Sequence, residues 1–265
     1  IVRDFFPWQR MVRGPSKGKK TMNIDSEEMQ QVAAAAAPRV DMYAGIHKAL
    51  RAAMADTLLA VGRMDCDDAM ELARTTGRVM ELLDFCASHL KHENDFVHAA
   101  IEARAPGASA AVAHDHDEHV AHIGQLCGAA AALLNLAPAD RARAAHRLYS
   151  ELALFIAANF QHMHVEETAH NAVLWARYTD AELIDIHNAL VASIPPQEMM
   201  FTARWLVPFM NPAERTALLA DMQAHAPAPA FDAILGTVRP HLDTHEWAKL
   251  ARSLGLPPVP GLVTA

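Results

Sequence analysis

The chain has 265 residues and a formal net charge of −8 at pH 7, and 52% of its residues are hydrophobic. The length allows one large domain or a domain with an extension, and the acidic balance excludes a general nucleic-acid binder. Its hydrophobic runs are shorter than the ~18 residues that a membrane span needs. Aromatic residues make up only 6%, while Ala, Leu and Met are abundant, so we predict an all-α protein.

Cysteine usage and the start of the chain indicate the compartment. The chain has 3 cysteines, widely spaced and odd in number, which is atypical of a disulfide framework or a zinc site. We expect Cys66, Cys86 and Cys127 to be small hydrophobic residues in a reducing compartment. No charged segment followed by an apolar one opens the chain as a signal peptide would. We therefore predict a cytoplasmic protein.

Residues 1–39 differ from the rest of the chain. The first 21 residues carry Asp4 as their single acid against six basic residues, which are Arg3, Arg10, Arg13, Lys17, Lys19 and Lys20. We expect residues 1–39 to form a basic, disordered arm and a leader, and residues 1–21 could instead be upstream sequence that is not part of the natural protein. An anchor for anionic lipid or nucleic acid is the weaker alternative.

The first two core helices each place a histidine among apolar residues. In the first helix, over 40–62, His47 shares a face with Tyr43 and Leu50 at spacings of three and four. The second helix, over 67–103, carries both His89 and Glu93 on its apolar stripe. Burying a carboxylate is costly unless something compensates its charge. A bound cation would do so.

The next two helices repeat this arrangement. The third helix, over 109–136, has His119 on its inner face, while His116 lies one turn nearer the end, where we expect solvent. The fourth helix, over 138–178, carries His162 and Glu166 on its apolar stripe. Glu167 is rotated from Glu166 by about 100°, so we place it outside the site or in a supporting shell.

The spacings reveal a diverged internal repeat. His47 and His89 are 42 residues apart (89 − 47), and His119 and His162 are 43 apart (162 − 119). In an up-down-up-down four-helix bundle these positions reach a similar level. We therefore predict one metal site in a bundle over 40–178, with ligands His47, His89, Glu93, His119, His162 and Glu166. Imidazole and carboxylate together favour iron, with manganese or zinc possible.

The order His, His-x-x-x-Glu, His, His-x-x-x-Glu resembles the hemerythrin-like family, also called HHE cation-binding domains, over residues 40–178. It looks more like the bacterial branch with four histidines and two glutamates than like the oxygen carriers, which have a second histidine on the third helix where position 123 is Ile. The resemblance implies two iron ions in a centre of the Fe–O–Fe type, bridged by Glu93 and Glu166. Glu167 remains an alternative bridge.

Three functions follow as alternatives. The first is a non-haem diiron protein that binds or senses O2 or NO, or takes part in iron homeostasis, without nucleic-acid or membrane partners. The second is a diiron enzyme, such as a peroxidase, an oxidase or an iron-centre repair protein. The third is a metal-free helical interaction module. A ferritin-like scheme with Glu167-x-x-His170 and Asp95-x-x-His98 ranks lower, because the helix over 40–62 contains no Glu.

Residues 179–265 are predicted to be a helical C-terminal extension that packs on the bundle or forms a dimer; the oligomeric state stays open. Helix starts are indicated by Thr179 with Glu182 and by Asn211 with Pro212 and Glu214. Four further histidines lack a carboxylate at ligand spacing and are expected on the surface, namely His187, His225, His241 and His245.

Overall fold

A computed structural model describes residues 39–257 of the chain. The arm and leader predicted for residues 1–39 therefore lie outside the described residues, apart from Arg39, as does the end of the chain from residue 258. The described residues are helical and contain no strand, which confirms the predicted all-α fold. None of the helices in residues 39–257 combines the length and the apolar character that crossing a membrane would require.

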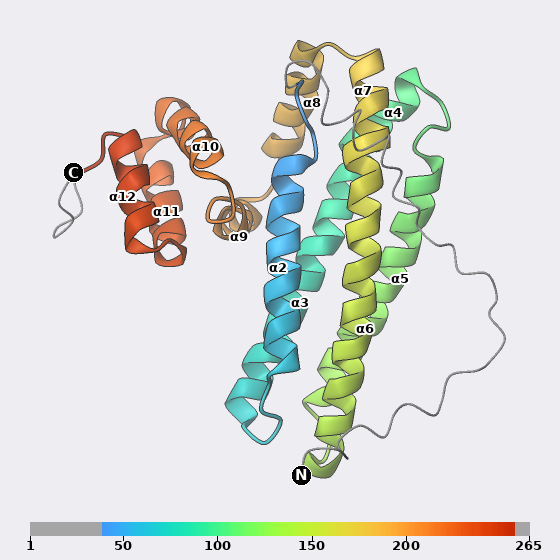
Figure 1. The fold of residues 1–265 in the computed structure, drawn as a ribbon. Coiled ribbons are helices and arrows are strands. Elements are labelled where there is room, and N and C mark those ends of the chain that lie inside the picture. The colour runs from blue at the N-terminus through green and yellow to red at the C-terminus, as the bar shows by residue number, and fades with distance from the viewer. Residues whose placement is uncertain (1–38, 258–265) are drawn as a thin grey trace, which may run out of the picture. The chain divides into compact units, whose positions relative to one another are not determined.

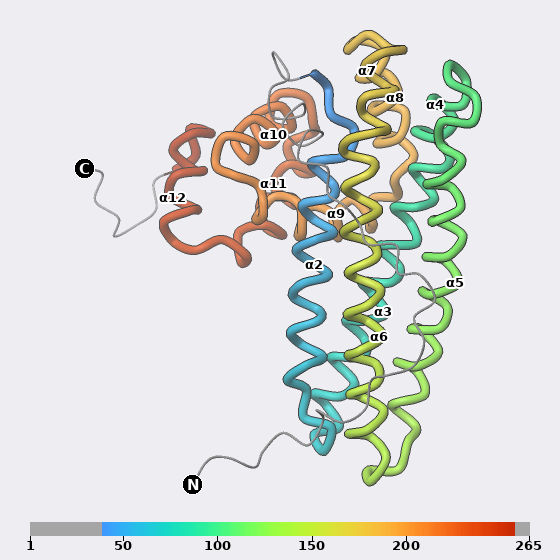
Figure 2. The backbone as a smooth tube through the Cα atoms, turned by 45° about the vertical axis from the view of Figure 1, so that its right-hand side comes forward, coloured from blue at the N-terminus to red at the C-terminus, as the bar shows by residue number. Residues whose placement is uncertain are grey.

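Four long helices run side by side and form the bundle (Figures 1 and 2), namely α2 (Ala44–Gly62), α3 (Ala69–His92), α5 (Ala110–Leu133) and α6 (Pro138–Val165). Each helix contacts two neighbours, so that α2 and α5 both lie between α3 and α6. The observed helices lie within the ranges predicted from the apolar stripes. The up-down-up-down bundle is confirmed.

Two of these helices continue through a π-helical turn. The second helix passes from α3 through η1 (Glu93–His98) into α4 (Ala99–Arg104). The fourth passes from α6 through η2 (Glu166–His170) into α7 (Asn171–Arg177). Short π-helical turns inside α-helices are rare and often mark functional sites. Here they occupy equivalent positions in the two halves of the repeat.

Side-chain caps and one glycine define the turns between the helices. Asp68 accepts hydrogen bonds from the backbone N–H groups of Met70 and Glu71, and so begins α3. Glu102 accepts from the backbone N–H of Gly107 at 2.6 Å and from the hydroxyl of Ser109 at 2.6 Å, which closes the turn between α4 and α5. Gly107 has a φ of 84°, a conformation that favours glycine.

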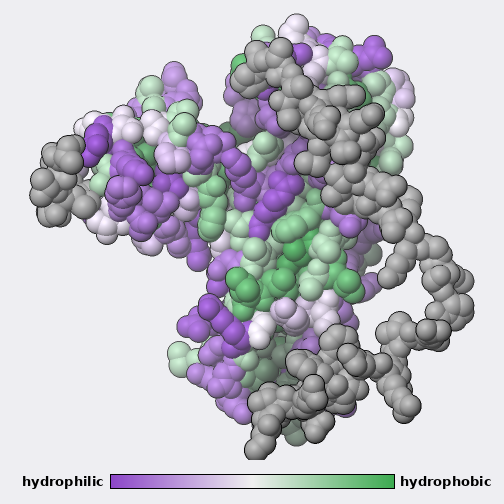
Figure 3. All heavy atoms as spheres, in the orientation of Figure 1, coloured by the Kyte–Doolittle hydropathy of each residue, from purple (hydrophilic) through white to green (hydrophobic). Residues whose placement is uncertain are grey.

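The bundle core consists of the apolar stripes of its four helices. Its fully buried members include Leu50, Met54, Leu83, Leu126, Leu152 and Phe155. Cys86 also lies in this core, and all three cysteines are free. Not every apolar side chain is inside. Figure 3 shows hydrophobic residues on the surface of the bundle, where Leu59 of α2 and Leu154 of α6 are 67% and 69% exposed.

After α7 the chain forms further helices: α8 (Asp180–Ser193), α9 (Pro196–Leu206), α10 (Pro212–His225), α11 (Ala228–Val238), η3 (Arg239–His241) and α12 (Thr244–Ser253). Capping boxes begin α8 at Thr179 and α10 at Asn211, as the sequence predicts. Helix α9 packs against α2 and places Trp205 in the bundle core. Helices α10, α11 and α12 share a separate core that includes Leu219 and Val238.

Candidate metal centre

Two buried carboxylates form the middle of the candidate site. Glu93 is the first residue of η1 and Glu166 is the first residue of η2. They are only 3% and 0% exposed. In a helix the residue four positions earlier lies on the same face. His89 therefore stands beside Glu93, with Nε2 3.2 Å from Oε1, and His162 stands beside Glu166 at the same distance.

Two further histidines approach the carboxylates from the other helices. His47 of α2 places Nε2 3.5 Å from Oε1 of Glu93 and 3.5 Å from Oε2 of Glu166. His116 of α5 places Nε2 3.6 Å from Oε2 of Glu93 and 3.5 Å from Oε1 of Glu166. Each of these histidines therefore faces both carboxylates.

The side chains make two groups that could each hold a metal ion. The first ligand group is His47, His89, Glu93 and Glu166, and the second is Glu93, His116, His162 and Glu166. Within a group, one ligand atom of each residue lies within 4.8 Å of the others. Both carboxylates belong to both groups. Such an arrangement suits two cations that share two bridging carboxylates.

Most of the ligand atoms lack hydrogen-bond partners, although Nε2 of His116 and Nε2 of His162 lie 3.0 Å from each other. Both carboxylate oxygens of Glu93 and of Glu166, and Nε2 of His47 and of His89, are buried without a hydrogen bond to any described residue. Leaving a buried polar atom unpaired costs about 1–3 kcal/mol, and more for a charged group. Buried polar groups are therefore normally satisfied. Bound cations would satisfy all of these atoms at once.

The outward-facing nitrogens of two histidines are held by acceptors. Nδ1 of His47 lies 3.0 Å from Oε1 of Glu167, which also accepts from Arg51 at 2.5 Å. Nδ1 of His116 lies 2.8 Å from Oδ1 of Asn94. An ionised carboxylate can only accept, so His47 carries a proton on Nδ1. This arrangement orients a histidine for metal binding through Nε2.

Charge pairing keeps the acids ionised despite their burial. Burial alone raises the pKa of Glu93, but His89 and His47 hold that pKa well below its usual range. Burial likewise opposes the ionisation of Glu167, yet hydrogen bonds from His47 and Arg51 lower its pKa to about 2. For His47, burial lowers the pKa, but Glu167 and Glu93 outweigh it and raise the pKa to about 9.

The structure brings together most of the predicted ligands. Every predicted ligand except one belongs to at least one of the two groups, namely His47, His89, Glu93, His162 and Glu166. The remaining predicted ligand, His119, is buried at 6% exposure, and its ring centroid lies 4.9 Å from that of His162. It belongs to neither group, and His116 from the same helix takes part instead.

The expectation that solvent surrounds His116 is wrong, because this residue is only 2% exposed. Asn94 hydrogen-bonds to it, and the ring of His98 stacks on it with centroids 4.7 Å apart. Both of these residues belong to η1, where the second helix continues beyond the level of the site. That continuation covers the start of α5.

Two more buried histidines were absent from the predicted ligand set. His98 and His170 are 5% and 2% exposed, and together with Glu166 they make a third group of potential ligands. The pairs Asp95-x-x-His98 and Glu167-x-x-His170 already indicated these residues, under a ferritin-like scheme. A regular helix turns the residue five positions after Glu93 away from its face. A π-helical turn holds an extra residue, which brings His98 back towards Glu93.

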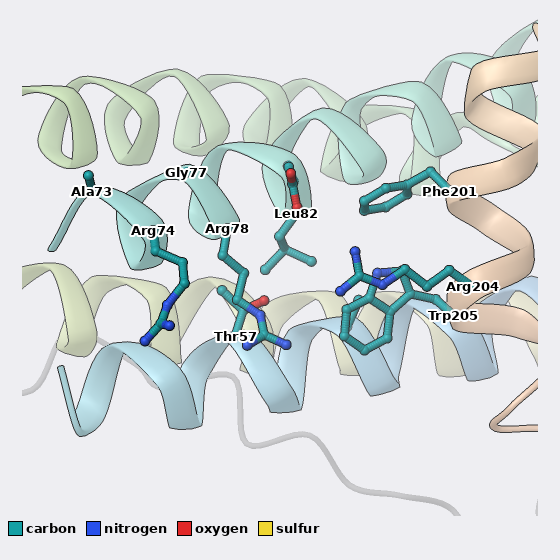
Figure 4. A pocket seen from close by; sticks show the side chains of 11 residues that line it. Thr57, Ala73, Arg74, Gly77, Arg78, Leu82, Phe201, Arg204 and Trp205 are labelled. Carbon is teal, nitrogen blue, oxygen red and sulfur yellow. The ribbon is translucent and has the colours of Figure 1, made fainter. Parts of the chain in front are cut away.

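A cleft of about 400 Å³ between α2, α3 and α9 is a separate feature (Figure 4). Arg74, Arg78 and Arg204 line it together with Phe201 and Trp205. Of the arginines, Arg78 forms an ion pair with Asp56. None of the three potential metal-ligand groups among residues 39–257 lies in this cleft. The cluster around Glu93 and Glu166 is therefore the stronger candidate for the functional site.

Comparison with known proteins assigns the bundle. No curated protein and no solved structure matched the chain. A family model described as the hemerythrin HHE cation binding domain matches residues 39–170. The match contains both ligand groups, and the buried cluster of histidines and glutamates fits a metal site. Residues 39–170 of this chain are therefore a hemerythrin HHE cation-binding domain.

Proposed function

We propose that the chain is a non-haem diiron protein. One iron ion would be held by the first ligand group and the other by the second, with Glu93 and Glu166 as the carboxylates common to both. The observation that carries this proposal is the set of four buried, unpaired carboxylate oxygens facing the Nε2 atoms of His47, His89, His116 and His162. Two bound cations would balance the charge of both carboxylates and give all four oxygens a partner.

The donor set favours iron over other cations. Each position offers two imidazole nitrogens and oxygens from two carboxylates. Imidazole suits iron, zinc and copper, whereas carboxylates shift the preference towards harder ions such as iron and manganese. The absence of cysteine from all three potential groups also argues against the soft ions that thiolates select. Manganese and zinc remain the competing ions for the same ligands.

Glu166 supports the bridging role better than Glu167 does. Glu166 is fully buried and belongs to both ligand groups. Glu167 is partly exposed, and its oxygens are engaged by His47 Nδ1 and Arg51. We therefore assign Glu167 the role of orienting His47. For the third helix, the same reasoning supports His116 as the ligand, with the ring of His119 packed edge to face against that of His162.

A centre of this kind serves the binding of a small molecule. Two histidines and two shared carboxylates leave coordination positions open on each metal, and bound iron would supply these positions to a diatomic ligand. We infer that the protein binds or senses O2 or NO, or takes part in iron homeostasis. The histidine and glutamate side chains of this chain would hold the metal pair in place, and burial would exclude bulk water from it.

Alanine substitutions on α3 and α5 test the ligand assignment with a control on each helix. His89→Ala and His116→Ala are expected to lose most of the bound iron, because each removes a histidine from one ligand group. The controls are His92→Ala on α3 and His119→Ala on α5, which lie outside both groups and are expected to retain it. Iron per chain is measured by elemental analysis of protein purified in parallel.

Circular dichroism of all four variants separates loss of a ligand from loss of the fold. The assignment is contradicted if a folded His92→Ala protein loses as much iron as His89→Ala. If a folded His119→Ala protein loses iron while His116→Ala retains it, His119 and not His116 is the metal ligand on the third helix.

A further inference from the structure

The histidines that follow the two glutamates converge on a third position. His98 of η1 and His170 of η2 place ring nitrogens within 4.8 Å of each other and of a carboxylate oxygen of Glu166. Their ring centroids lie 5.2 Å apart in an edge-to-face arrangement. We call His98, Glu166 and His170 the third ligand group. It shares one residue with the dinuclear site and adds two that neither of the other groups contains.

The third ligand group has the same pattern as the other two. Nε2 of His98 and Nε2 of His170 are buried without a hydrogen-bond partner among the described residues. On the opposite side of its ring, His170 Nδ1 lies 3.1 Å from the hydroxyl of Tyr43, which is 1% exposed. A proton on Nδ1 can be donated to that oxygen, and this leaves the lone pair of Nε2 free for a cation. Glu167 holds His47 in the same manner.

The third ligand group is a buried donor set of two imidazoles and one carboxylate. His98, His170 and Glu166 are only 5%, 2% and 0% exposed. Buried polar groups without partners are costly, and one bound cation would satisfy all three side chains together.

We propose that the third ligand group binds a third divalent transition-metal ion, next to the dinuclear centre of the proposed function on which this inference rests. Two imidazoles and one carboxylate suit a first-row cation that completes its coordination with water, as three-ligand zinc sites do. The third position offers three protein ligands, against four in each of the other groups. An ion at the third position would also be repelled by the two ions of the proposed dinuclear centre. We therefore expect it to bind more weakly than the pair.

A zinc titration of the full-length, metal-depleted chain tests this proposal, with zinc as the probe because it accepts such a site without redox change. The wild-type chain is expected to bind two ions tightly and a third more weakly. His98→Gln and His170→Gln should each lose only the third ion. Tyr43→Phe should keep it but weaken its binding about 10–100-fold, as supporting residues of metal ligands do. His92→Gln, a histidine of the same helix outside every group, should retain all three ions.

A crystal of the zinc-loaded wild-type chain gives an independent readout. Anomalous scattering should show a peak between His98 and His170, in addition to the two peaks between the glutamates. Two tight ions with no third, or a third ion that persists in both His98→Gln and His170→Gln, would overturn this inference and leave the dinuclear centre intact. A wild-type chain that binds no zinc tightly would instead overturn the proposed function together with this inference.

Discussion

Glu166→Gln is expected to remove most of the iron from the protein, while Glu167→Gln leaves most of it bound at saturating iron. The two residues are adjacent in the chain, and the substitution is nearly isosteric in both. Glu166 offers its carboxylate to the first, second and third ligand groups, so that its loss weakens every position at once. Glu167 reaches the site only through Nδ1 of His47. Losing such a supporting residue costs about 10–100-fold in metal affinity, short of the loss of a shared ligand.

The measurement is iron per chain after dialysis against a weak chelator, together with the dissociation constant from a competition titration. Both variants are checked for helical content, because Glu166 is buried and Glu167 also pairs with Arg51. Arg51→Met is the matched control, since it removes the partner of Glu167 and leaves both carboxylates in place. A Glu167→Gln protein that loses more iron than Glu166→Gln would reverse the assignment of the bridge.

Removal of metal is expected to lower the unfolding temperature substantially. In the absence of cations, the oxygens of Glu93 and Glu166 are buried without hydrogen bonds, as is Nε2 of His89. Ligand binding stabilises the folded state by about 4 kcal/mol at a free metal concentration 1,000 times the dissociation constant. In a domain of this size, each kcal/mol shifts the unfolding temperature by about 2–4 °C. Chelation should therefore lower it by about 8–16 °C.

Calorimetry of chelated and iron-reconstituted protein, scanned at the same ionic strength, measures this shift. Glu166→Gln is the control, because a chain without the shared carboxylate should gain little stability from added iron. The stability account is contradicted if complete iron removal, verified by elemental analysis, leaves the unfolding temperature of the wild-type chain unchanged.

The helices of the bundle could be predicted because their local signals agree. Apolar stripes at spacings of three and four identify the buried face. Pro138 marks where the fourth helix begins, as observed for α6. The inward positions of His89, Glu93, His162 and Glu166 followed from the same stripes. Residues that a regular helix places on one face can be found from spacing alone.

What could not be predicted depends on departures from regular geometry and on distant contacts. The π-helical turn that begins at Glu93 shifts the face of the residues that follow it, so the 3.6-residue period misplaces His98. The burial of His116 arises from a helix that begins elsewhere in the chain. The extension was predicted either to pack on the bundle or to form a dimer, and no local signal decided that Trp205 of α9 would enter the bundle core. These features arise from packing between segments that are distant in sequence.

The most direct test of the central claim is the metal content and absorption spectrum of the full-length protein purified in air. The proposed diiron centre predicts about two iron ions per chain and ligand-to-iron charge-transfer bands that bleach on reduction. Zinc or manganese at similar stoichiometry would support the ligand groups but contradict the assignment of iron. Fewer than about one metal ion per two chains, with no such bands after reconstitution with ferrous iron, would contradict the metal centre itself.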